Sequence, residues 1–137
     1  MRLQLDWDAE NQLIREAPES GREQSGDVKV EFEYDYRNRR VAKRVYTWDG
    51  TERDLTASRK YVWDGWRLLL ELDAGGETLM VLRACTTGLD LAGQNGQVNS
   101  PESAGAIGGL LAAYDANRDL PLWYFYDGNG NVRQVLR

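Results

Sequence analysis

The sequence predicts an all-β fold, an antiparallel meander of repeated hairpins in one sheet region over residues 1–137, with little helix. Three observations predict it. Residues 27–36 alternate between apolar or aromatic and charged side chains, which is the two-residue period of a half-buried strand. Pairs of an aromatic residue and an aspartate recur in front of tight-turn residues. No segment of useful length has the 3.6-residue apolar period of a helix.

The composition argues against several functional classes. The 137 residues carry a net charge of −5 with both signs interspersed, which argues against a nucleic-acid groove. Histidine is absent, so the usual general base and the commonest metal ligand are missing, and a single cysteine excludes an internal disulfide framework. We therefore predict no enzyme, no catalytic residues, no metal and no cofactor. The first residues do not read as a signal peptide, and no apolar run is long enough to span a membrane.

The first half of the chain predicts two hairpin units, over residues 3–17 and 28–48. In the second unit Val28, Val30, Phe32, Tyr34 and Tyr36 share one face of a strand, and the charged residues between them share the other. A turn at residues 37–39 leads to a return strand over residues 40–48. A polar loop is expected from Asp49 to about Ser58.

The second half predicts two more units, over residues 59–73 and 120–136. A further strand is expected over residues 78–84, followed by a glycine-rich interruption over residues 86–109. We expect this interruption to be a loop, with a short turn of helix after Pro101. Strands over residues 110–115, 120–127 and 132–136 complete the sheet.

The aromatic–aspartate pairs form a repeat. Asp8, Asp35, Asp64 and Asp127 follow one another at steps of 27, 29 and 63 residues, and the last step is close to twice the others. One unit is therefore replaced by the glycine-rich interruption, where Asp90 marks its remnant.

The repeat has a physical reason at the turn. Each aspartate ends a strand and can accept backbone N–H bonds within the turn that follows. The residue three positions on needs a positive φ, which asparagine and glycine tolerate. Arg67 does not fit this rule, so Gly65 is expected to take the strained position in its unit. The predicted structural turn residues are Asp8, Asn11, Asp35, Asn38, Asp64, Gly65, Asp127 and Gly130.

These units resemble the YD repeats of RHS-repeat proteins, whose pattern is a Tyr-Asp pair, a glycine-type turn, an arginine and an apolar residue. The nearest matches are residues 34–41, which begin Tyr34-Asp35, and residues 126–132, which begin Tyr126-Asp127. Residues 63–66, 88–93 and 108–112 resemble, in the same order, the region before the core-associated end of long bacterial RHS proteins. Residues 83–87 depart from the aromatic-rich strand expected there, which leaves local pairing open and fits a truncated gene copy.

The resemblance implies a function. Repeats of this family build a hollow β-sheet shell that encloses a toxic or variable C-terminal domain. The implied role is a non-catalytic structural segment of such a shell, outside the cell or in its envelope. Its implied partners are other segments of a longer RHS chain, or copies of itself joined through open sheet edges. The self-cleaving core of the family has no counterpart in this sequence, so that activity is not expected.

A second function stays open, because tryptophans on a sheet can stack on sugar rings. The candidate residues are Trp48, Trp63, Trp66 and Trp123. They would make the chain a free-standing carbohydrate or cell-surface binding module, whereas cross-strand aromatic pairing is the plainer interpretation. Residues 127–131 also resemble half of a calcium loop, but they lack its glycine at the sixth position and its twelfth ligand.

Overall fold

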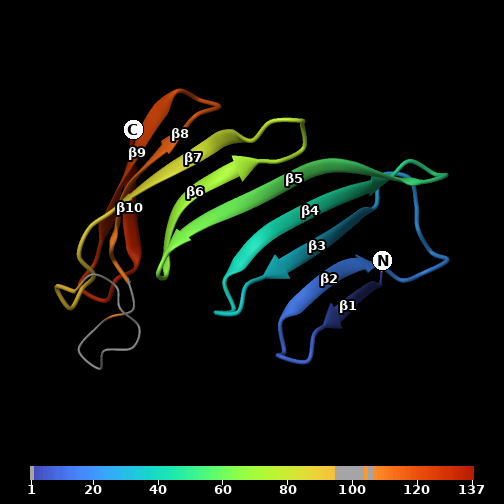
Figure 1. Cartoon of the computed structure of the whole chain (residues 1–137), viewed down its shortest axis with the longest axis horizontal. Helices are drawn as coiled ribbons and strands as arrows, with labels where there is room; N and C mark the ends of the chain where they lie inside the picture. Colours follow the sequence, from blue (N-terminus) through green and yellow to red (C-terminus); the bar gives the residue numbers. More distant parts are fainter. Residues whose placement is uncertain (1, 95–103, 105–106) are drawn as a thin grey trace. The chain divides into compact units, whose positions relative to one another are not determined.

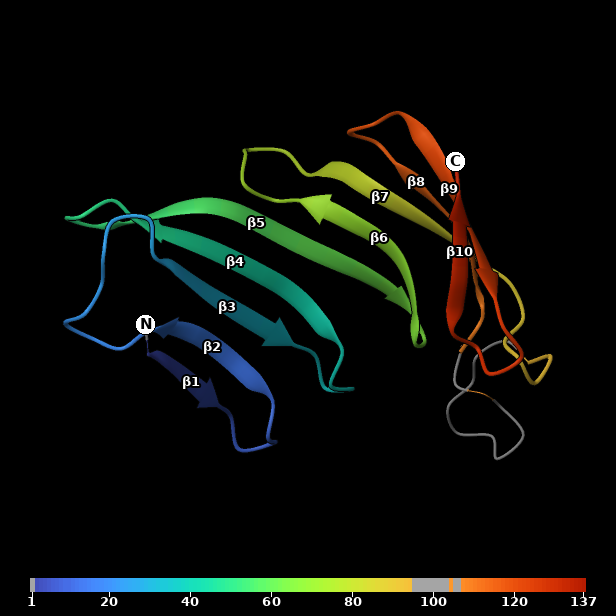
Figure 2. The same cartoon turned by 180° about the vertical axis from the view of Figure 1, so that it is seen from behind.

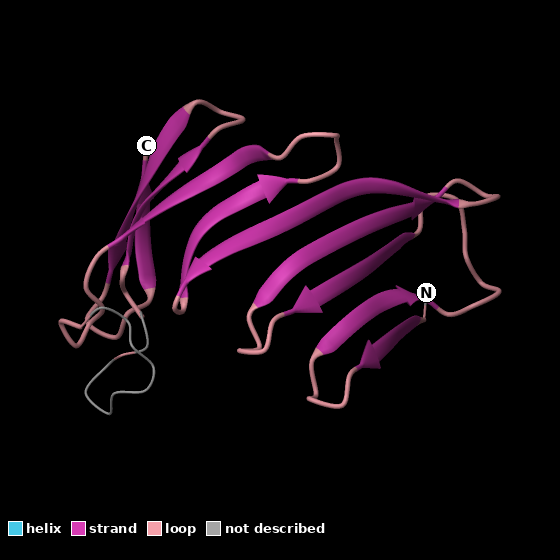
Figure 3. Ribbon diagram, in the orientation of Figure 1, coloured by secondary structure: helices cyan, strands magenta, loops and turns pink. Residues whose placement is uncertain are grey.

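The computed structural model describes residues 2–94, 104 and 107–137. Within this part of the chain all regular structure is β-strand, and no helix is present (Figure 3). Ten antiparallel strands form one sheet in which each strand follows its predecessor in sequence (Figure 1). The predicted all-β meander is therefore confirmed. The expected helical turn after Pro101 lies outside the described residues.

The strands alternate in direction along the chain and most are joined by short turns. They are β1 (Leu3–Trp7), β2 (Leu13–Pro18), β3 (Val28–Tyr34), β4 (Arg40–Trp48), β5 (Arg53–Asp64), β6 (Arg67–Asp73), β7 (Met80–Thr87), β8 (Leu110–Asp115), β9 (Leu120–Tyr126) and β10 (Val132–Leu136).

Several predicted strand boundaries were wrong. β3 ends at Tyr34, before the predicted Tyr36, because Asp35 already belongs to the turn. β5 begins at Arg53, where a loop to Ser58 was predicted, because Asp49 closes a tight turn by accepting backbone N–H groups. β7 continues to Thr87 instead of ending at residue 84.

The chain divides into two compact units. The first comprises residues 1–60 and 73–80, and the second comprises residues 61–72 and 81–137. In the first unit β1 to β4 and the start of β5 lie side by side, which is seen equally from behind (Figure 2). In the second unit β7, β8, β9 and β10 pair in succession.

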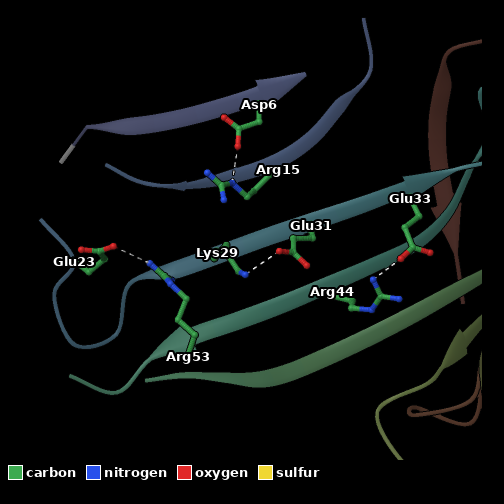
Figure 4. A network of polar contacts seen from close by, with 8 residues as sticks. All are labelled: Asp6, Arg15, Glu23, Lys29, Glu31, Glu33, Arg44 and Arg53. Carbon is green, nitrogen blue, oxygen red and sulfur yellow. Dashed lines mark hydrogen bonds and ion pairs between the residues drawn. The ribbon is translucent and has the colours of Figure 1, made fainter. Parts of the chain in front are cut away.

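One face of the first unit carries a row of alternating charge across four strands. Asp6 lies opposite Arg15, Arg15 opposite Glu31, and Glu31 opposite Arg44. The Arg15 Nε atom lies 2.6 Å from an Asp6 carboxylate oxygen, and Arg44 pairs with the carboxylate of Glu33 (Figure 4). The Lys29 ammonium on the same face lies 2.8 Å from Glu31, which holds the pKa of the Glu31 carboxyl below its usual value. These contacts favour one register over its neighbours.

On the opposite face of the first unit, β3 presents apolar side chains to a mixed set of neighbours, and Val30 lies opposite Glu16 of β2. Val30 lies opposite Val45, and Phe32 lies opposite Lys43, whose aliphatic stem can cover the ring. Arg40 adds its guanidinium over the Phe32 ring at 4.1 Å from the ring centre. This is the predicted alternation of residues 28–34 between the two faces.

The sheet has no deep hydrophobic core among the described residues. Its buried apolar side chains are small alanines, namely Ala17, Ala42, Ala112 and Ala113. Large apolar side chains remain exposed on both units, including Leu3, Leu5, Ile14 and Val28 in the first and Leu111, Trp123, Phe125 and Val135 in the second. The fold is therefore held mainly by cross-strand pairs and by its turns.

Candidate functional site

The aspartate turns are the recurring local structure of this chain. In the turn after β1, the Asp8 carboxylate Oδ1 accepts the backbone N–H groups of Glu10 and Gln12, both at 2.9 Å. The Asp8 backbone N–H donates to the Gln12 carbonyl at 3.0 Å, and the Asn11 N–H donates to the Asp8 carbonyl at 3.2 Å. One carboxylate oxygen therefore accepts two backbone donors of a five-residue turn, and two backbone–backbone bonds close the turn.

The turn after β3 repeats this arrangement. Asp35 Oδ1 accepts from the backbone of Arg37 at 2.9 Å and of Arg39 at 3.1 Å. The second carboxylate oxygen accepts from the Arg39 guanidinium at 2.6 and 2.8 Å. This guanidinium bond, followed by the backbone donors, holds the pKa of the Asp35 carboxyl below its usual value.

The turn between β9 and β10 is a third copy. Asp127 Oδ1 accepts from the backbone of Asn129 at 2.9 Å and of Asn131 at 3.0 Å. The Asn131 side-chain amide donates to both carboxylate oxygens, and together these bonds lower the pKa of the Asp127 carboxyl. Because both oxygens are engaged by N–H donors of the turn, they are not presented to a cation.

A fourth copy lies within the glycine-rich segment, at Asp90. Its Oδ1 accepts from the backbone of Ala92 at 3.0 Å and of Gln94 at 2.9 Å, and its N–H donates to the Gln94 carbonyl at 2.8 Å. The other oxygen accepts the Ala104 N–H at 3.0 Å, and Asp90 is only 6% exposed. The predicted remnant thus has the complete hydrogen bonding of an aspartate turn, and its aspartate is buried although residues 91–94 are exposed.

The residue three positions after each of these aspartates has a positive φ. The angles are 61° at Asn11, 62° at Asn38, 72° at Gly93 and 80° at Gly130. The choice of glycine at position 130 has a further cause. A Cβ atom there would lie 2.5 Å from Ile107 and 2.7 Å from Leu91, so the Asp127 turn packs directly against the glycine-rich segment.

Asp64 makes a different turn. Only two residues separate β5 from β6, and Gly65 carries the positive φ of 57°. Arg67 at the start of β6 forms an ion pair with the Asp64 carboxylate. The aromatic–aspartate pattern therefore marks two kinds of turn, and Asp64 with Gly65 belongs to the shorter kind.

The hairpins of Asp8, Asp35 and Asp127 also carry a β-bulge at the same place. The strand register skips Ile14 in β2, Val41 in β4 and Arg133 in β10, each six positions after its turn aspartate. The register of β7 and β8 skips Leu111 in the same way. In the hairpins of Asp8, Asp35 and Asp127, a bulge at the same position increases the local twist in the same way.

The tyrosines of the two Tyr-Asp pairs join consecutive hairpins. The Tyr34 hydroxyl donates to the Leu13 carbonyl at 3.0 Å, and the Tyr126 hydroxyl donates to the Leu110 carbonyl at 2.7 Å. In both cases the acceptor is the residue immediately before the bulge of the preceding hairpin. We call this arrangement of a Tyr-Asp tyrosine with a pre-bulge carbonyl the hairpin joint.

The first joint includes a contact between the two turns. The Gln12 side-chain amide donates to the Asn38 side-chain oxygen at 2.9 Å. These are the residues four and three positions after their respective aspartates. The strand pairing beside the joint also follows one rule. The first residue after the bulge of one hairpin lies opposite the residue four positions before the turn aspartate of the next hairpin. Arg15 thus lies opposite Glu31, and Ala112 lies opposite Trp123.

The four candidate stacking tryptophans are distributed over both units. Trp48 belongs to the first unit, where the Arg53 guanidinium lies 5.6 Å from its ring centre. Trp63, Trp66 and Trp123 belong to the second unit. Trp66 is 38% exposed and Trp123 is 50% exposed, whereas Trp63 is half-buried.

Other chemical groups show no built site in the described part of the chain. No cluster of three or more acidic, cysteine or histidine side chains with metal-binding proximity occurs there. Cys85 is a half-buried thiol opposite Ala113, and burial raises its pKa above the usual value. No described helix has the length and apolar character needed to cross a membrane.

Sequence reasoning found the turn residues but missed the bulges and the tyrosine acceptors. The tyrosine was visible in the repeat, whereas its acceptor lies 21 residues away at Leu13 and 16 residues away at Leu110. The chain matches no protein-family model, and no curated protein matches it significantly.

Proposed function

We propose that this chain is a non-catalytic structural segment of an RHS/YD-repeat β-sheet wall. The wall encloses or presents a toxin or another variable C-terminal domain. The observation that supports this most is the hairpin joint, which occurs twice with the same acceptor position. A joint of this kind lets hairpins be added in series, with each new unit fixed to the one before it.

The chemistry of the aspartates supports a structural role. In each of the four turns, one carboxylate oxygen of the aspartate accepts hydrogen bonds from two backbone N–H groups of the same turn. A carboxylate used in this way shapes the backbone and offers little to a substrate. The repeated aspartates thus stabilise the turns that connect neighbouring strands, and a continuous β-sheet wall requires such turns.

The distribution of apolar residues supports a wall rather than an isolated globule. A free-standing domain of this length normally buries large side chains in a core. Here no described side chain of large volume is fully buried, and many apolar residues are exposed. Other segments of a longer RHS chain are the proposed partners, and the proposed location is outside the cell or in the envelope.

The DNA on either side of these 137 codons tests the proposal directly. It should encode further aromatic–aspartate hairpins at steps near 27–29 residues, followed downstream by a core end and a variable domain. Limited proteolysis of that longer product should then leave the variable domain uncut. Flanking DNA without such repeats in any frame, or a variable domain cleaved as fast as in isolation, contradicts the proposal.

The exposure of Trp66 and Trp123 favours one alternative, a carbohydrate or cell-surface binding module. An aromatic face can stack on a sugar ring without any change of fold. Retention on a glycan array or a heparin column that is lost in Trp66→Ala or Trp123→Ala would support it. The absence of retention on both surfaces would exclude it.

A further inference from the structure

We propose that β10 of one chain pairs with β1 of a second copy of this chain, head to tail, through the same hairpin joint that operates inside the chain. This inference rests on the proposed function and names a partner for it. In the described sheet β1 and β10 are the outer strands, so each has one edge available for pairing.

The accepting end is the β10 edge. Val132 lies five positions after Asp127 and immediately before the bulge residue Arg133, which is the place that Leu13 occupies after Asp8. The Leu13 carbonyl is the acceptor for Tyr34 in the next hairpin. By the same geometry the Val132 carbonyl is the acceptor for the next aromatic residue, and Val132 is 51% exposed.

The donating end is the β1 edge. Trp7 precedes Asp8 as Tyr34 precedes Asp35, and it is 53% exposed. Its indole N–H is a donor where the tyrosines have a hydroxyl. One chain therefore carries an acceptor at one edge and an aromatic donor at the other.

The strand register follows from the two internal joints. There the first residue after the bulge pairs with the residue four before the next aspartate. Applied to two copies, this rule places Gln134 of one opposite Gln4 of the other, and Val135 opposite Leu3. The first pair is neutral and exposed, and the second brings together apolar side chains that are 44% and 52% exposed.

The turns are complementary as well. Inside the chain Gln12 donates to Asn38 across the joint. The corresponding residues at the outer edges are Asn131 and Asn11. Because the Asn131 amide N–H groups are engaged by Asp127, the Asn11 amide donates and the Asn131 side-chain oxygen accepts in this contact. Because the two edges differ, the contact is heterologous, and copies add in series instead of stopping at a dimer.

Site-directed disulfide formation tests the register. In the Cys85→Ser background, a Gln4→Cys chain carrying a size tag is mixed with an untagged Gln134→Cys chain and oxidised mildly. Residues directly opposite in an antiparallel pair have Cα atoms about 4.5–5.5 Å apart, within the range of a disulfide. A Gln4→Cys chain with a Leu136→Cys chain is the matched control, because the register separates these positions by two residues.

The expected result is a tagged–untagged dimer formed several-fold more by the matched pair than by the control. Sedimentation velocity of the wild-type chain should show species larger than a dimer as concentration rises. Equal yields for both pairs, mainly like-with-like dimers, or a monomer at all concentrations overturns the proposal. A monomer would assign these edges to other hairpins of a longer chain and would leave the proposed wall function standing.

Discussion

The Tyr126 hydroxyl lies 2.7 Å from the carbonyl oxygen of Leu110, which is the residue just before the bulge of the preceding hairpin. Tyr34 makes the equivalent bond to Leu13 in the other unit. The tyrosine of the Tyr-Asp pair therefore acts between hairpins, whereas the aspartate acts within its own turn. This division of roles explains why the two residues occur together.

Removing the tyrosine hydroxyl should weaken the joint. Tyr34→Phe and Tyr126→Phe keep the ring but lose the hydrogen bond, so each should lower the free energy of unfolding by about 0.5–1.5 kcal/mol. Urea denaturation followed by fluorescence measures this change. Tyr36→Phe is the control, because Tyr36 is 83% exposed and should unfold like the wild type. An equal loss of unfolding free energy in all three variants would contradict a stabilising role for the hydrogen bonds of Tyr34 and Tyr126.

Asp90 should be the most sensitive of the turn aspartates. Asp90→Ala removes the buried carboxylate that accepts the N–H groups of Ala92, Gln94 and Ala104, so we expect the free energy of unfolding to fall by about 1–3 kcal/mol. Asp8→Ala should lose less, because water reaches its exposed turn. Asp90→Asn keeps one carbonyl oxygen as an acceptor, so its free energy of unfolding should lie between those of Asp90→Ala and the wild type. Equal free energies of unfolding for Asp90→Ala and Asp8→Ala would contradict the structural importance of the buried Asp90 carboxylate.

The turn at Asp127 contains two glycines, Gly128 and Gly130, that allow a matched test. Gly130→Ala combines a φ of 80° with Cβ contacts of 2.5 and 2.7 Å, so it should be destabilised by about 2 kcal/mol or more. At Gly128 a Cβ atom meets nothing within 4 Å, and Gly128→Ala should stay within about 0.5 kcal/mol of the wild type. Thermal unfolding monitored by circular dichroism compares them. The opposite order would mean that this turn is packed differently.

Acid should destabilise the protein through the turn carboxylates. The pKa values of Asp35 and Asp127 are lowered from the ordinary 3.8 by their hydrogen-bond donors. A group with a lowered folded pKa stabilises the fold above its unfolded pKa and loses that contribution as pH falls through the folded value. Stability measured by urea should therefore fall below about pH 4, and less steeply in Asp35→Asn. An unchanged slope in this variant would contradict the assignment.

Much of the fold could be predicted from the sequence because the turn residues are of types that favour tight turns. The alternation of residues 28–34 and the positive-φ residues Asn11, Asn38 and Gly130 depend on short-range sterics, which one sequence displays. The complete turn at Asp90 was expected only as a remnant, because its hairpin is interrupted by the glycine-rich segment. Residues 83–87 lack the expected aromatic side chains, which left their pairing open, and in the structure Cys85 and Thr86 pair with the small residues Ala113 and Ala112.

The contacts between hairpins could not be predicted from the sequence because they depend on where each β-bulge falls. A bulge moves the register by one residue, and a shift of one residue exchanges the two faces of a strand. The row from Asp6 through Arg15 and Glu31 to Arg44 exists only in the register that the bulges set. The same holds for the Tyr34 and Tyr126 acceptors, which depend on where the preceding bulge falls.

Amide hydrogen exchange at the turns tests most directly whether the aspartates serve the backbone or a ligand. We expect slowed exchange, with no ligand added, at the amides two and four positions after each aspartate: Glu10, Gln12, Arg37, Arg39, Ala92, Gln94, Asn129 and Asn131. Amides one position after Asp8 and Asp127, at Ala9 and Gly128, should exchange quickly. Fast exchange at all of these amides, with protection appearing only when calcium or a glycan is added, would contradict the account.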